Sequence, residues 1–150
     1  MRRKSNQIEA ENFGQARNDE QRGLTEKAIK GYSTILKKNP LHLDATARLL
    51  VLFRKTKNID NEIALLRTSI ASHEKHIEKA QQAWIAEHRQ IAEDSRELAK
   101  MLGLLNAKEL PFYEHEVLQK WKKRLDGLEA RSTKIKAKVS KKTSSSKAKA

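Results

Sequence analysis

Apolar residues recur at helical spacing over most of the chain, which predicts a protein built from helices. The clearest case covers residues 25–38, where one face is formed by Ala28, Tyr32, Ile35 and Leu36. Gly23 is expected to end the preceding helix, since glycine favours the position just past a helix C-terminus. Thr25 is the expected N-cap of this helix. Asn39-Pro40 is expected to close it, because the residue before proline is pushed out of the α region.

The helix expected next, over about residues 43–56, is the most apolar segment of the chain. Its main stripe, which Leu50 and Val51 widen, consists of Ala45, Leu49, Leu52, Phe53 and Thr56. A helix that is apolar on more than one side is expected to lie buried between neighbours. After a polar break at Lys57-Asn58, a further helix is predicted by the spacing of Ile59, Ile63, Leu66 and Ile70. Residues 8–22 predict a weaker, more polar helix whose inward groups are Ile8, Phe13 and Ala16.

A long helix is predicted from Ser72 or His73 to about Met101. Five apolar residues lie seven positions apart along it, namely Ile77, Trp84, Ile91, Leu98 and Leu105. Glu87 and Asp94 occupy companion positions, where a coiled-coil seam would not place carboxylates. We therefore expect this helix to dock on the preceding helices through a narrow stripe and to overhang them. The Ile77–Leu105 stripe fits two alternatives, an intramolecular core or the seam of a homodimer.

A last helix is expected to begin at Pro111, because the first helical position needs no amide proton. One face of it is formed by Leu110, Val117 or Leu118, Trp121, Leu125 and Leu128. Trp84 and Trp121 both lie on apolar stripes, so we expect them to meet where the last two helices pack. Residues 132–150 contain seven lysines, seven Ser or Thr residues and no acid, a composition that cannot offset its ordering entropy. The expected organisation is a flexible basic leader (1–7), a single helical-repeat domain (8–130) and a disordered Lys/Ser-rich tail (131–150).

An offset of 34 residues relates the two halves of the first helical region. Ile29 falls on Ile63, Tyr32 on Leu66 and Leu36 on Ile70. The segment 9–42 supplies Ala16, Gly23, Ala28, Tyr32 and Pro40, and the segment 43–76 supplies Leu49, Phe53 and Leu66. This pattern resembles the tetratricopeptide repeat family over about residues 9–76. It departs from that family at four positions, Asp19, Lys57, Glu62 and Glu74.

The resemblance implies an all-α fold, a right-handed stack of helical hairpins. Two tetratricopeptide-like repeats would be capped by the long helix and by a C-terminal basic helix. The alternative is a pair of ordinary helical hairpins without a repeat relationship. Hairpins of this kind cannot bury their apolar faces alone, so in either case each leans on the next.

The resemblance also implies a peptide-binding groove on the first helix of each pair. The positions concerned are Phe13, Arg17, Glu20, Asp44, Ala47, Val51 and Arg54. Ala47 and Val51 stand where the family's carboxylate clamp needs Asn or Lys, so the groove would be of mixed character. Packing against other helices is the favoured alternative for Phe13 and Val51. Changing Arg17 and Arg54 to Glu is expected to abolish partner capture and to leave thermal unfolding unchanged.

Positive charge is concentrated at the C-terminal end of the chain. The net charge is +13, and residues 119–150 hold 12 Lys or Arg against 2 Asp or Glu. Such groups can bind nucleic-acid phosphates without reading bases, or they can simply keep the protein soluble. The candidate phosphate ligands are Lys120, Lys122, Lys123, Arg124, Lys134, Lys136, Lys138, Lys141 and Lys142. The tail has no aromatic residue, so stacking on single-stranded bases is not expected.

Composition and motifs argue against catalysis and cofactors. The 150 residues suffice for one domain, and the lack of cysteine removes disulfides, thiol catalysis and thiolate metal sites. No catalytic or nucleotide-binding motif is present, and the five histidines fit solvent-exposed positions better than a metal site. No apolar run is long enough to span a membrane, so we expect a cytoplasmic protein. The leading function is a non-enzymatic protein-interaction module or small scaffold, and the alternative is non-specific nucleic-acid binding.

Overall fold

The structure is a computed structural model, and it describes residues 2–111 and 115–147. The described residues form helices α1 (Arg2–Gln21), α2 (Thr25–Lys38), α3 (Leu43–Lys55), α4 (Ile59–Glu87), α5 (Arg89–Met101) and α6 (Glu116–Lys147). The only strand-like pairing among them is an isolated bridge between Leu105 and Pro111. The prediction of an all-α fold is confirmed.

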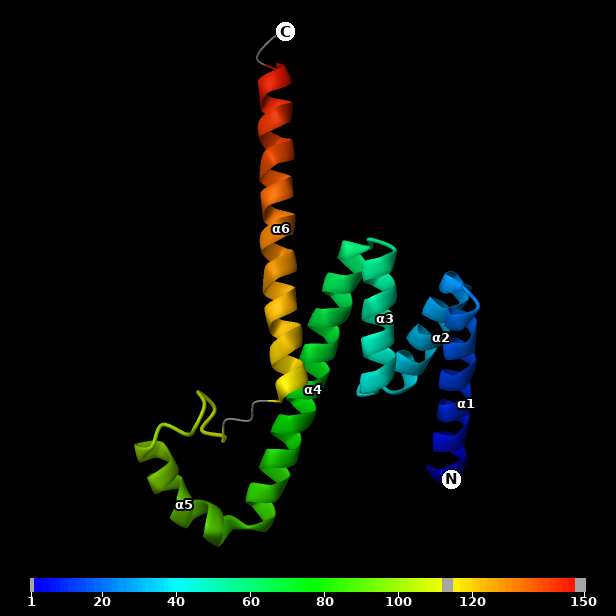
Figure 1. Cartoon of the computed structure of the whole chain (residues 1–150). Coiled ribbons are helices and arrows are strands. Elements are labelled where there is room, and N and C mark those ends of the chain that lie inside the picture. The colour runs from blue at the N-terminus through cyan, green and yellow to red at the C-terminus, as the bar shows by residue number, and fades with distance from the viewer. Residues whose placement is uncertain (1, 112–114, 148–150) are drawn as a thin grey trace.

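The first four helices lie side by side and alternate in direction, so that each packs on the next (Figure 1). After α4 the chain turns into the short helix α5, which contacts α4 only weakly. Helix α6 then runs back along α4 in the opposite direction and continues well beyond it (Figure 1). The body of the molecule is therefore α1 to α4 with the first half of α6.

The turns at the start of the body follow local sequence signals. Gly23 has a φ of +76° just past α1, and its amide donates to the Glu20 carbonyl at 3.1 Å. Asn39 ends α2, as the following proline predicts. Thr25 is not the N-cap, because Leu24 occupies that position and no side chain caps the helix there.

Two apolar clusters form the core, and α3 lies between them. The first joins α1, α2 and α3 through Ala16, Ala28, Tyr32, Ile35, Ala45, Leu49, Leu52 and Phe53. The second joins α3, α4 and α6 through Leu50, Ile63, Leu66, Ile70, Leu118, Trp121 and Leu128. Leu65 packs against both clusters, so the faces that carry Tyr32 and Leu66 are linked through α3. The breadth of the apolar face predicted for α3 is thus explained by burial on two sides.

The region predicted as one long helix is divided at a different point. Helix α4 shows no break near Ser72 and ends at Glu87, and its C-cap His88 has φ and ψ of −119° and 42°. The His88 ring lies against Trp84, with ring centroids 4.6 Å apart, and its Nδ1 is 3.0 Å from the Trp84 carbonyl oxygen. The His88 amide still donates to the Trp84 carbonyl at 3.0 Å, so the break lies in the φ and ψ of His88 and not in a lost hydrogen bond. The Ile77–Leu105 stripe is therefore not one continuous face.

The prediction that Pro111 begins the last helix is wrong, because Pro111 takes part in the isolated bridge and α6 begins at Glu116. The side chain of Asn106 organises this loop by accepting from the amides of Lys108 at 2.9 Å and Leu110 at 3.1 Å. Leu110 and Pro111, which the prediction placed at the start of the last helix, therefore belong to this loop.

The structure also differs from the sequence prediction at both ends. Helix α1 already begins at Arg2, where a flexible leader is predicted, and α6 continues to Lys147, where a disordered tail is predicted. Neither 2–7 nor 131–147 contains Gly or Pro, and both are rich in residues that tolerate a helix. Residues 1 and 148–150 of the predicted leader and tail lie outside the described residues.

Candidate interaction surfaces

Two of the predicted groove residues, Phe13 and Glu20, make contacts within the body. Phe13 is half-buried, with ring centroids 5.6 Å from Tyr32 and 5.3 Å from His42. Glu20 accepts from the Tyr32 hydroxyl at 2.8 Å and from Arg48 Nε at 3.1 Å. Burial and this hydrogen bond raise the pKa of Tyr32 to about 12. Phe13 and Glu20 thus fasten α1 to its neighbours.

The other groove positions differ in exposure and in the contacts they make. Arg17, Asp44 and Ala47 are exposed, and Val51 is half-buried. Arg54 is bound to Glu62, so it is not available as a free cation. The structure therefore does not gather these positions into one open cluster of unused side chains. It also corrects the prediction that Arg54→Glu leaves stability unchanged, because the new carboxylate would face that of Glu62.

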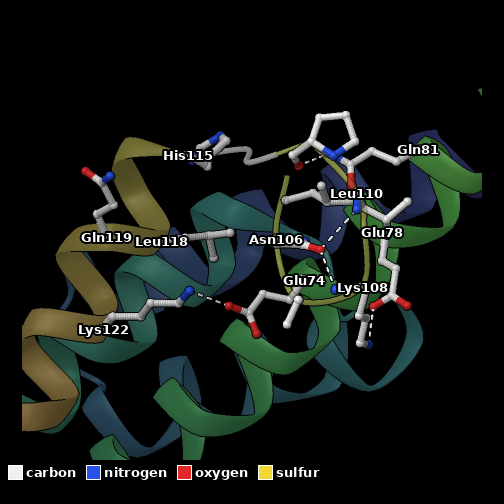
Figure 2. A pocket seen from close by; sticks show the side chains of 13 residues that line it. Glu74, Glu78, Gln81, Asn106, Lys108, Leu110, His115, Leu118, Gln119 and Lys122 are labelled. Carbon is white, nitrogen blue, oxygen red and sulfur yellow. Dashed lines mark hydrogen bonds and ion pairs between the residues drawn. The ribbon is translucent and has the colours of Figure 1, made fainter. Parts of the chain in front are cut away.

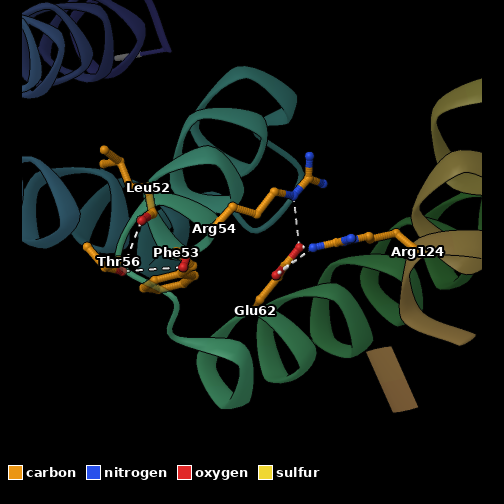
Figure 3. Close-up of polar contacts among 6 residues, drawn as sticks. All are labelled: Leu52, Phe53, Arg54, Thr56, Glu62 and Arg124. Atoms are coloured by element: carbon orange, nitrogen blue, oxygen red, sulfur yellow. Dashed lines mark hydrogen bonds and ion pairs between the residues drawn. The ribbon is translucent and has the colours of Figure 1, made fainter. Parts of the chain in front are cut away.

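Glu62 is the most unusual polar residue of the body. It is only 1% exposed, yet it carries a carboxylate (Figure 3). Its Oε1 accepts from Arg54 Nε and from Arg124 Nε, both at 2.9 Å, and its Oε2 accepts from an Arg124 terminal nitrogen at 3.3 Å. Burial raises the pKa of Glu62, but the two arginines outweigh burial and hold that pKa below its usual value. This triad joins α3, α4 and α6.

Glu62 is one of the positions at which the sequence departs from the tetratricopeptide pattern, which has a small residue there. The sequence did not reveal the role of that departure. Arg124 approaches from a helix 62 positions away in sequence, and no local spacing predicts this. Arg124 is therefore a structural cation, although it was a candidate phosphate ligand.

The remaining basic candidates divide into two groups. Lys122 pairs with Glu74, and Lys120 pairs with Glu116 at 2.7 Å, so these two lysines already face carboxylates. Lys123 is exposed on the same helix. The other candidates project from α6 beyond the body and are exposed, namely Lys134, Lys136, Lys138, Lys141 and Lys142.

A cavity of about 570 Å³ lies between α4, the 106–111 loop and the start of α6 (Figure 2). Lys108 Nζ lies 2.8 Å from Glu78, and Lys122 pairs with Glu74 at its rim. Gln81 donates to the Pro111 carbonyl at 3.0 Å. These charges are mutually neutralised, and within the described part of the chain no group of three His, Asp or Glu is placed to hold a metal ion. The cavity presents no set of groups that we can assign to a reaction.

A row of exposed apolar side chains lies along α5 and its C-cap residue, Leu102. Ile91, Leu98 and Leu102 recur at intervals of seven and four and are 58%, 60% and 62% exposed; we call them the α5 stripe. No residue of α5 is buried. Trp84, expected to meet Trp121, is instead about half exposed near this helix, whereas Trp121 is buried in the second cluster. The α5 stripe is therefore not the intramolecular core that the sequence allowed.

The charges around the α5 stripe are not balanced. Arg96 pairs with Glu109, and Lys100 Nζ lies 4.0 Å from the same carboxylate. Asp94 and Glu97 are exposed on α5, and no described residue forms an ion pair with either. The free charge beside the α5 stripe is therefore negative.

The second half of α6 is the other unpartnered surface. We call residues 130–147 the α6 overhang; this segment contains no Asp or Glu. Ile135 and Val139 are more than half exposed and continue the helix face that carries Trp121 and Leu128 inside the body. The overhang thus combines a short apolar face with a high positive charge.

Comparison with protein-family models, with curated proteins and with solved structures finds no match for this chain. Among the helices that the structure describes, none combines the length and the apolar character needed to cross a membrane.

Proposed function

We propose that this chain is a non-enzymatic protein-interaction module, or small scaffold, whose α5 stripe receives a protein partner. The observation that carries this proposal is the row of large apolar side chains along α5 and its C-cap, which stay more than half exposed. Contiguous exposed apolar patches with polar rims are typical of interaction sites. The partner surface should be apolar and bordered by cations, because Asp94 and Glu97 are exposed on α5 and no described residue forms an ion pair with either.

In this proposal the body acts as a rigid support. The pairs α1–α2 and α3–α4 would be two tetratricopeptide-like repeats in a right-handed stack, with α6 closing its open side. The alternating directions of these helices and their consecutive contacts support that arrangement. A cytoplasmic location is part of the same proposal.

A second candidate function is polyanion binding by the α6 overhang. It is favoured by one observation, the absence of acidic residues from 130 onward on a helix whose lysines are exposed. Binding of this kind would neutralise phosphates without reading sequence.

A double variant tests the leading proposal. Ile91→Ser with Leu98→Ser is expected to reduce capture of proteins from a nuclease-treated cell extract by about tenfold or more, because two apolar anchors are removed. The matched control is Ile8→Ser with Ile59→Ser, which removes two exposed isoleucines from other helices. Captured proteins are measured on beads that carry equal amounts of each chain.

The result would contradict the proposal if both double variants retained the same proteins as the wild type. The polyanion candidate would instead be supported if proteins were captured only from an extract without nuclease treatment, and if this capture were also lost on removal of residues 131–150.

A further inference from the structure

We propose that the partner of the α5 stripe is a second copy of this chain, which contributes its α6 overhang. This inference rests on the proposed function and names the occupant of that same surface. It joins two exposed surfaces that the body leaves without a partner.

The apolar parts of the two surfaces are both short rows of exposed aliphatic side chains. Inside the body the apolar face of α6 is covered by α4, but α6 continues past the end of α4 (Figure 1). Among the described helices none packs on Ile135 and Val139, and the residues of the α5 stripe stay more than half exposed. Laying one amphipathic helix on the other would remove both apolar faces from water.

The free charges of the two surfaces are opposite in sign. Lys134, Lys138 and Lys142 recur at intervals of four, so they form a row beside Ile135 and Val139. On α5, Asp94 lies beside Ile91 and Leu98 of the α5 stripe, and Glu97 lies next to Asp94 on the side away from the stripe. Within the described residues none of these five charges forms an ion pair, whereas the cations Arg96 and Lys100 are held by Glu109. Complementary charge of this kind favours one register and partner over others.

One chain cannot form this contact with itself. The α5 helix lies at one end of the molecule and the α6 overhang at the other, and α6 is a continuous helix between them (Figure 1). A two-fold axis across α6 would place the overhang of each copy at the α5 end of its partner. The contact would then form twice, as in the closed dimers that are common among oligomers.

The mass of the full chain in solution gives the first test. Light scattering coupled to gel filtration is expected to show twice the chain mass of 17.2 kDa at micromolar concentrations. A single-chain mass throughout the concentration range would overturn the inference. If the chain is a monomer but Ile91→Ser with Leu98→Ser still reduces protein capture, the proposed function holds and only the dimer inference is overturned.

A charge swap gives the sharper test. The acidic-overhang variant carries Lys134→Glu, Lys138→Glu and Lys142→Glu, and the basic-stripe variant carries Asp94→Lys and Glu97→Lys. Each variant alone sets like charges against each other, so its self-association should weaken by about tenfold or more. An equimolar mixture restores opposite charges at both contacts and should recover the dimer. Circular dichroism confirms that both variants keep their helices.

Three outcomes would overturn the inference. The mixture could stay monomeric, or only the basic-stripe variant could lose the dimer, which would indicate a seam between two α5 helices. In the third outcome the wild type has a single-chain mass and retains duplex DNA, and the acidic-overhang variant does not retain it. That result would assign the overhang to nucleic-acid binding.

Discussion

Replacing Arg54 and Arg124 together by alanine is expected to lower the free energy of unfolding by about 3–5 kcal/mol at pH 7. Both arginines donate to Glu62, which is almost fully buried, so their removal leaves a carboxylate without a compensating charge. The Arg67–Glu129 pair offers a matched control, because it also joins α4 to α6 but is exposed. Arg67→Ala should cost less than about 1 kcal/mol. Urea unfolding of the three proteins measures the difference.

The pH dependence of this penalty has a definite sign. The wild-type Glu62 has a pKa below its usual value of 4.5, so its contribution is present above that value and is lost as pH falls through the folded-state pKa. Without the two arginines only burial acts on the carboxyl, which raises the pKa and favours the protonated form. The stability gap between wild type and double variant should therefore narrow from pH 7 to about pH 4. An equal gap at both pH values would show that the triad is not electrostatically important.

Trp121→Ala is expected to destabilise the protein by about 3–5 kcal/mol, the cost of removing a large buried aromatic side chain. Trp121 packs between α4 and α6, and its ring meets that of His73 with centroids 5.6 Å apart. Trp84→Ala is the matched control and should cost less than about 1 kcal/mol, because Trp84 is about half exposed. Chemical unfolding gives both values. Similar losses for the two tryptophans would mean that α6 is not docked as described.

Helix faces in the body could be predicted because their spacing is local. The faces of α2 and α3 follow directly from residues such as Tyr32, Ile35 and Leu49, all of which are buried. Gly23 marks the end of α1 by its positive φ, a conformation that other residues rarely adopt. These features depend on a few neighbouring residues, and one sequence is enough to reveal them.

Features that depend on distant contacts were predicted poorly. The break lies at His88, beside Trp84, and no glycine or proline marks it in the sequence. The repeat of seven continued smoothly from Ile77 to Leu105 in sequence, although the chain changes direction within it. The carboxylates of Glu87 and Asp94 were local signs that this face is exposed, and we interpreted them as marking a narrow docking stripe.

The candidate site shows the same limit. Spacing places Phe13, Glu20 and Arg54 on one side of their helices, but it cannot say which neighbour lies there. In the structure these three side chains contact Tyr32, Arg48 and Glu62. The candidate interaction surface is therefore on α5 and not in the predicted groove. The second part of the predicted long helix, α5, turns away from the body instead of docking on it (Figure 1).

The central claim is that the α5 stripe is the surface that a partner covers, and the reactivity of a thiol placed there tests it most directly. The chain has no cysteine, so Leu98→Cys introduces a single thiol, and Ile8→Cys provides a control of similar exposure on α1. In dilute solution both thiols should react at similar rates. Cysteine-free wild-type chain, or the captured proteins, are then added at ten times the Kd. The thiol of Leu98→Cys should now react about tenfold more slowly, and the reaction rate of the Ile8→Cys thiol should not change. Equal rates for the two thiols under all these conditions would contradict the claim.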